Sequence, residues 1–202
     1  MSGKKTFDTK KLVLLALLTA IVVVLQVLSA TFPVYPFKLA LVLVPIVIGS
    51  ALISPFAGAW LGLVFGGVVL ITSFSTGDIF FLMLYSYNPF ATIIVVLIKG
   101  LLAGYAAGLV FNLLKKAGKI IPAIAAAVIC PIVNTGIFVL GMYLFFLPVL
   151  AGEGITGAAN IAYTIFIGMI GLNFLIELVI NIILGPAISR LIQHRQETKI
   201  HS

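Results

Sequence analysis

Charged residues are scarce in this sequence. Its 202 residues include 12 Lys or Arg and 5 Asp or Glu, so only 8% are charged, whereas an ordinary soluble domain has roughly a quarter. Apolar residues make up 62% of the chain, and a soluble protein of this size could not bury that much apolar surface in one core. The composition therefore excludes a soluble globular domain and indicates a protein embedded in lipid.

Residues that commonly carry catalysis or bind metals are also few. Cys130 is the single cysteine, and the two histidines, His194 and His201, lie close to the C-terminus. The sequence has no Cys/His spacing typical of a metal site, no phosphate-binding Gly-x-x-x-x-Gly-Lys-[Ser/Thr] loop and no hydrolase motif. We therefore predict no catalytic residue, no metal, no cofactor and no ATP hydrolysis by the chain itself.

Long apolar runs dominate what remains. A helix needs about 20 apolar residues to cross roughly 30 Å of hydrocarbon, and Pro or Gly residues divide the chain into runs of suitable length. The fold class predicted is an all-α integral membrane protein, a single domain over residues 1–202. Its six expected transmembrane helices cover residues 12–30, 39–53, 56–72, 90–114, 120–147 and 158–184. Residues 79–87 are apolar but too short to cross, so we expect a re-entrant or interfacial segment there.

The positions of the basic residues predict the topology. With six spans, ten of the twelve fall on one side of the membrane: Lys4, Lys5, Lys10, Lys11, Lys115, Lys116, Lys119, Arg190, Arg195 and Lys199. Basic residues beside spans are typical of the cytoplasmic side. Both termini are therefore expected in the cytoplasm, and the net charge of +7 indicates membrane orientation rather than binding to nucleic acid.

Small residues recur at every fourth position in three of the expected spans. Such stripes allow helix backbones to approach closely in lipid. They are Ala16 and Ala20; Gly58, Gly62 and Gly66; and Gly100, Gly104 and Gly108. For the two glycine stripes we predict packing within this chain, while the alanine stripe fits either internal packing or contact with a partner.

Polar groups inside the expected spans are the strongest functional indication. A charge at membrane depth costs about 2.5 kcal/mol or more unless it is paired or hydrated, and Lys99 and Glu177 both lie deep. Asn134 and Asn173 are expected at nearly the depth of Lys99. One interpretation is a structural Lys99–Glu177 ion pair. The other is a substrate pocket that opens outward, in which Lys99 meets an anionic group and the asparagines bind hydroxyls or amides.

Aromatic residues gather on the two loops expected above that level. Residues 31–38 contain Phe37, and residues 79–90 contain Tyr85 and Asn88 among several aromatics. Aromatics at a membrane interface often form only a belt. Their concentration here also fits a pocket wall or lid, so Phe37, Tyr85 and Asn88 join the candidate substrate-binding residues.

The chain resembles the substrate-binding S component of energy-coupling factor (ECF) vitamin importers. The similarity covers nearly the whole chain and includes Ala16-x-x-x-Ala20, the Phe37-Lys38-Leu39 sequence, and residues 54–62 (SPFAGAWLG). This last stretch is similar to the family pattern Gly-Pro-x-x-Gly-x-x-x-Gly, with Ser54 where glycine is usual. The resemblance implies a multi-pass protein of the prokaryotic plasma membrane, which binds a vitamin and assembles with a membrane coupling subunit and two ATPase subunits. It also implies that Ala16 and Ala20 bind the coupling subunit.

The vitamin is a separate question. Lys99 favours a carboxylate, and the stretch around Asn134, Thr135 and Gly136 resembles pantothenate-type members, so pantothenate is the first expectation. Folate, riboflavin and a corrinoid remain alternatives. A stand-alone secondary transporter or channel for a small organic solute is the rival function, and Glu177 would then be its candidate coupling acid.

Overall fold

The computed structural model describes residues 9–31, 41–118, 120–152 and 172–198. These residues form helices joined by short turns, and none of them is in a strand. The helices are α1 (Thr9–Thr31), α2 (Leu43–Leu52), α3 (Pro55–Thr76), α4 (Ile79–Tyr87), α5 (Pro89–Leu114), α6 (Ile121–Phe145), α7 (Leu147–Gly152) and α9 (Leu172–Thr198). The prediction of an all-α fold is confirmed for this part of the chain.

Four of these helices, α1, α3, α5 and α6, are long and apolar enough to cross a membrane. They correspond to four of the six predicted spans. The predicted span 39–53 corresponds to α2, a helix of 10 residues, which at 1.5 Å per residue is about 15 Å long. The predicted span 158–184 overlaps the start of α9, whose apolar part is the short stretch Phe174–Pro186. The count of six spans therefore stays a prediction.

The two glycine stripes pack against each other where α3 crosses α5. A β-carbon on Gly62 would collide with the carbonyl of Gly100, and one on Gly104 would collide with the carbonyl of Gly58. At one end of the crossing, a β-carbon on Gly66 would lie 2.8 Å from the carbonyl oxygen of Val96. Only hydrogen side chains allow two backbones this close. The prediction that these stripes pack inside the chain is confirmed.

Beside this crossing lies the aliphatic core of the bundle. Leu43, Ile46 and Val47 of α2 are fully buried, together with Leu61 of α3 and Val22 of α1. The short α2 is therefore surrounded by the longer helices and fills the interior of the bundle.

Helix α3 continues past its predicted end. The third span was predicted over residues 56–72, but the helix runs on to Thr76. The hydroxyls of Ser75 and Thr76 donate to the carbonyls four residues earlier, at 2.9 and 2.8 Å, so polar side chains are satisfied without leaving the helix. Gly77, with φ of 66°, then ends it in a left-handed conformation that favours glycine.

Helix α4 confirms the short segment predicted between the third and fourth spans. Asp78 caps its start by accepting a hydrogen bond from the Phe81 N–H at 3.2 Å. Asn88 ends it and caps α5, accepting from the Ala91 N–H at 3.0 Å, with Pro89 in the first turn. These caps satisfy N–H groups that helix starts leave unpaired.

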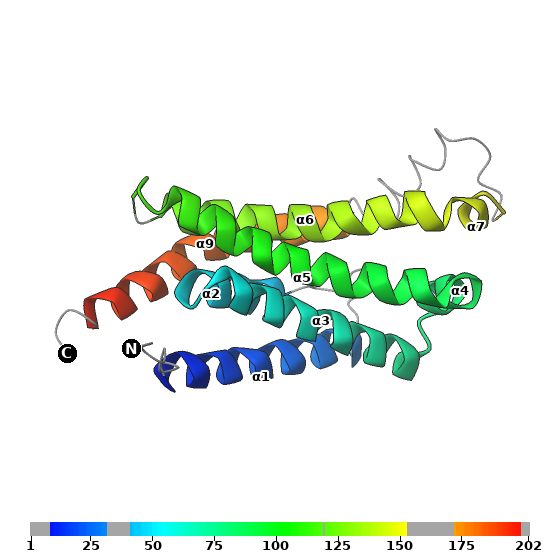
Figure 1. Cartoon of the computed structure of the whole chain (residues 1–202), viewed down its shortest axis with the longest axis horizontal. Coiled ribbons are helices and arrows are strands. Elements are labelled where there is room, and N and C mark those ends of the chain that lie inside the picture. The colour runs from blue at the N-terminus through cyan, green and yellow to red at the C-terminus, as the bar shows by residue number, and fades with distance from the viewer. Residues whose placement is uncertain (1–8, 32–40, 119, 153–171, 199–202) are drawn as a thin grey trace, which may run out of the picture.

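The two ends of the bundle differ in charge. Figure 1 places the start of α1, the connection from α5 to α6 and the far end of α9 at one end, and α4 and α7 at the other. The first of these ends carries Lys10, Lys11, Lys115, Lys116 and Arg190; we call it the basic end. This arrangement is the one predicted for a chain with both termini on one side, and placing that side in the cytoplasm remains a prediction.

Candidate ligand-binding cavity

A cavity of about 270 Å³ lies among the helices, near the end opposite the basic end. Helices α1, α3, α4, α5, α6 and α9 all contribute to its wall. Its polar and charged lining residues are Gln26, Ser29, Thr72, Ser73, Thr76, Asp78, Thr92, Lys99, Asn134, Thr135 and Glu177. This wall combines apolar surface with a limited set of polar groups, as ligand sites in proteins usually do.

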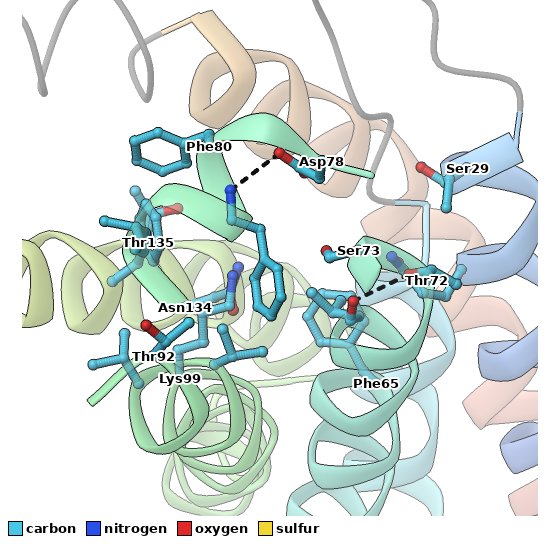
Figure 2. Close-up of a pocket in the computed structure, with 18 of the residues that line it drawn as sticks. Ser29, Phe65, Thr72, Ser73, Asp78, Phe80, Thr92, Lys99, Asn134 and Thr135 are labelled. Carbon is cyan, nitrogen blue, oxygen red and sulfur yellow. Dashed lines mark hydrogen bonds between the residues drawn. The ribbon is translucent and has the colours of Figure 1, made fainter. Parts of the chain in front are cut away.

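One side of the cavity presents a cation and an amide (Figure 2). Lys99 comes from α5, and its Nζ lies 4.8 Å from the centroid of the Phe138 ring of α6. Asn134, one turn before Phe138, is 6% exposed. Its Oδ1 is buried and accepts no hydrogen bond from the described residues. A buried acceptor left without a donor costs about 1–3 kcal/mol, so a ligand N–H or O–H placed here would be stabilised.

Hydroxyl groups line the facing side. Figure 2 shows Thr72 and Ser73 of α3 with Ser29 of α1 across the cavity from Asn134 and Thr135. The Thr72 hydroxyl donates to the carbonyls of Val68 and Val69, at 2.8 and 3.2 Å. Its oxygen still has acceptor capacity. These neutral hydroxyls can therefore accept or donate hydrogen bonds to a ligand without adding a charge to this side of the cavity.

Aromatic rings and two carboxylates complete the wall. Phe80 and Phe81 of α4 line the cavity, and Phe74 meets the Phe81 ring edge to face at 4.9 Å between centroids. Asp78 lines the cavity while its carboxylate caps α4. Glu177 of α9 also lines it and is 5% exposed. The cavity thus combines one ammonium, two carboxyl groups, hydroxyls, two amides and aromatic surface, which suits binding of a polar molecule with an apolar part.

Comparison with known families decides which kind of protein holds this cavity. The family model described as "ECF transporter, substrate-specific component" matches residues 10–189. The chain belongs to this family. No curated protein and no solved structure matches the chain. As an ECF substrate-specific component, or S component, it works with the membrane and ATPase components of its transporter, and the resemblance seen in the sequence is confirmed.

The S component brings together two of the residues predicted to bind substrate. Lys99 and Asn134 share one side of the cavity. Asn173 lies in α9, with its side chain outside the described part of the structure, and Phe37 lies outside the described residues altogether.

Tyr85 and Asn88 are positioned differently from the expectation. Neither lines the cavity. Tyr85 packs on Phe74 and Phe81, with ring centroids 4.8 and 6.0 Å apart, so it supports the aromatic wall from behind. The Asn88 side chain is used to cap α5.

Several lining residues of the S component did not feature in the sequence prediction. Gln26 and Ser29 of α1 and Thr92 of α5 line the cavity, although the first span was considered only for packing and partner contact. The sequence did contain a sign of this role. Gln26 and Ser29 are polar residues within an apolar run, and their spacing of three puts them on one face of the helix. Such a residue deep in a span commonly faces the interior of the bundle.

The predicted partner-binding residues lie on another part of α1. Ala16 and Ala20 are both exposed, while Leu18 and Val22 of the same helix are buried. The described chain therefore leaves the alanine stripe uncovered and does not use it for packing between its own helices.

Proposed function

We propose that this S component binds a small water-soluble vitamin that carries a carboxylate, with pantothenate as the first candidate, and delivers it to an ECF importer. The observation that carries the proposal is the shared side of the cavity formed by the Lys99 ammonium and the buried amide of Asn134. An ammonium and a carboxylate form a charge-assisted hydrogen bond, roughly twice as strong as a neutral one. The Asn134 oxygen, which accepts no hydrogen bond from the described part of the chain, is suited to an amide N–H or a hydroxyl of the same ligand.

The two polar sides of the cavity fit a molecule with a polar group at each end. Pantothenate has a carboxylate at one end, hydroxyls at the other and an amide between them. In our proposal its carboxylate meets Lys99, its amide meets Asn134, and its hydroxyls meet Thr72 and Ser73 across the cavity. Phe81 and Phe138 would cover the apolar part of the ligand.

Cavity size favours a small vitamin over the larger alternatives. The described residues line a cavity of about 270 Å³, close to the lower limit of roughly 300 Å³ for ligand pockets. Pantothenate is flexible and lacks a fused ring, whereas riboflavin and folate contain fused rings and a corrinoid is a macrocycle. Among the vitamins considered, the smallest is therefore the best supported.

Mass spectrometry of the small molecule that copurifies with the detergent-solubilised chain tests this proposal. We expect pantothenate, or another small hydroxy acid, in the purified protein. A neutral or cationic compound, or a large ring system, would contradict the proposed substrate class.

Uptake measurements distinguish the proposed role from a stand-alone transporter, for which Glu177, one of two acids in the cavity, is the candidate coupling acid. Proteoliposomes that contain this chain alone should bind the vitamin without accumulating it. Accumulation driven by a proton or sodium gradient would favour the stand-alone transporter. Accumulation that needs the coupling and ATPase subunits with ATP would favour the S component.

A further inference from the structure

A second cavity lies on the outside of the bundle at the basic end. It is a groove of about 420 Å³ between α5 and α6. Its lining side chains are all aliphatic: Val110, Ile121, Ile124, Ala125, Val128 and Ile129. None of them lines the ligand-binding cavity, so the groove is a separate site.

Two lysines stand where this groove reaches the basic end. Lys115 and Lys116 follow Leu114, the last residue of α5, and both are exposed. The Ala117 N–H donates to the Leu114 carbonyl at 2.8 Å, which closes a turn directly after the helix. At 1.5 Å per residue, Lys115 lies about 8 Å beyond Val110 along the axis of α5. The apolar groove therefore lies at the end of the bundle that carries these two ammonium groups.

We propose that this groove and the two lysines bind an anionic phospholipid from the membrane leaflet at the basic end. Its phosphate would lie at Lys115 and Lys116, and one acyl chain would follow α6 from Ile121 toward Ile129. That stretch is about 12 Å long, comparable to a substantial part of an acyl chain. Basic residues beside membrane helices attract anionic lipids by about 1 kcal/mol for each Lys or Arg near the surface.

The shape of the groove favours a lipid chain over a partner helix. Helices that associate in a membrane use stripes of small residues to bring their backbones together. Ala125 is the single small residue among the groove's lining side chains, and the others are branched. Nearby, Leu113 is 78% exposed, so this face of α5 has the aliphatic character of a surface in contact with lipid.

Native mass spectrometry of the full chain, titrated with dioleoyl phosphatidylglycerol or dioleoyl phosphatidylcholine, tests the proposal. The wild-type protein should retain phosphatidylglycerol in preference. Lys115→Gln with Lys116→Gln should reduce that preference about thirtyfold. Lys10→Gln with Lys11→Gln is the matched control, since it removes two charges from the same end but away from the groove, and should leave the preference unchanged.

A variant that fills the groove provides a second, independent test of the proposal. Ala125→Phe should weaken retention of both lipids, because it occupies the space for the acyl chain. If both lysine double variants lose the preference for phosphatidylglycerol equally, the proposal is overturned, because the overall positive charge of the basic end would then explain lipid binding without the groove. Normal lipid retention in Ala125→Phe, together with lost copurification of the ECF coupling subunit, would overturn it in favour of a protein interface. If Ala125→Phe does not fold, the lysine variants still decide the question, because they change exposed residues only.

Discussion

The ammonium nitrogen of Lys99 lies 4.8 Å from the centroid of the Phe138 ring, so a cation from α5 rests against an aromatic face from α6. A contact of this kind contributes about 0.5–2 kcal/mol, depending on how far the cation is desolvated. Asn134 lies one helical turn before Phe138, and its amide lines the same cavity. Two neighbouring helices thus place a cation and an amide at one level of the bundle.

The first prediction concerns ligand affinity. Lys99→Met should weaken binding of the carboxylate ligand by about 2–5 kcal/mol, the usual cost of removing one side of a buried charged pair. Isothermal titration with the detergent-solubilised protein measures this change. Lys10→Met, at the opposite end of the bundle, is the control and should bind normally.

The same variant also tests the structural alternative, in which Lys99 pairs with Glu177. Removing Lys99 would then strand a buried carboxylate and destabilise the unliganded protein by about 3–5 kcal/mol. The double variant Lys99→Met with Glu177→Gln would recover much of that loss. Lost stability rescued in this way, with unchanged ligand affinity, would mean that Lys99 has a structural role.

The hydroxyl side of the cavity gives the second prediction. Ser73→Ala should weaken ligand binding by about 0.5–1.5 kcal/mol, the net contribution of one neutral hydrogen bond. Ser75→Ala is a close control, because Ser75 is exposed on the same helix and its hydroxyl donates to the Ile71 carbonyl. Equal effects of the two substitutions on affinity would remove Ser73 from the binding site.

The third prediction concerns the crossing of α3 and α5. Gly62→Ala places a methyl group against the backbone of Gly100, and overpacking of this kind costs about 1–3 kcal/mol. Gly67→Ala, in the same helix, meets nothing within 4 Å and should be neutral or stabilising, because alanine favours helix more than glycine does. Thermal unfolding in detergent separates them, and equal melting temperatures would contradict the described crossing.

The fourth prediction concerns assembly. Ala16→Leu or Ala20→Leu should block copurification with the ECF coupling subunit while leaving ligand binding unchanged, because a bulky side chain prevents close approach of a partner helix. Gly136→Leu on α6 is the control, since Gly136 is also small and exposed. Normal assembly after both alanine changes would show that the coupling subunit binds another face.

Sequence patterns predicted the parts of this molecule that depend on helical periodicity. Gly62 and Gly100 belong to stripes of period four, and such a stripe defines one face of a helix wherever that helix packs. The depth of Lys99 and Asn134 along their helices placed both at one level for the same reason. In each case, counting residues along the helix was enough to predict which side chains share a face or a depth.

Other features depend on contacts that a single sequence does not specify. Whether Ser73 continues a helix or begins a loop depends on hydroxyls that bond to preceding carbonyls, and the side of α1 that meets the cavity depends on how the bundle packs. Asn88 is a case in which local chemistry was informative, because Asn followed by Pro is typical of a helix start. The sequence alone therefore favoured a capping role for Asn88 over a role in ligand binding.

The most direct test of the central claim compares pantothenate with pantothenol, in which an alcohol replaces the carboxylate, on the wild-type chain and on Lys99→Met. We predict that the wild-type protein binds pantothenate more tightly by about 2–5 kcal/mol, and that the difference largely disappears in Lys99→Met, because the two changes remove opposite sides of one charged contact. Equal binding of the two compounds by the wild-type protein, or a preference for pantothenate that Lys99→Met leaves intact, would contradict the account.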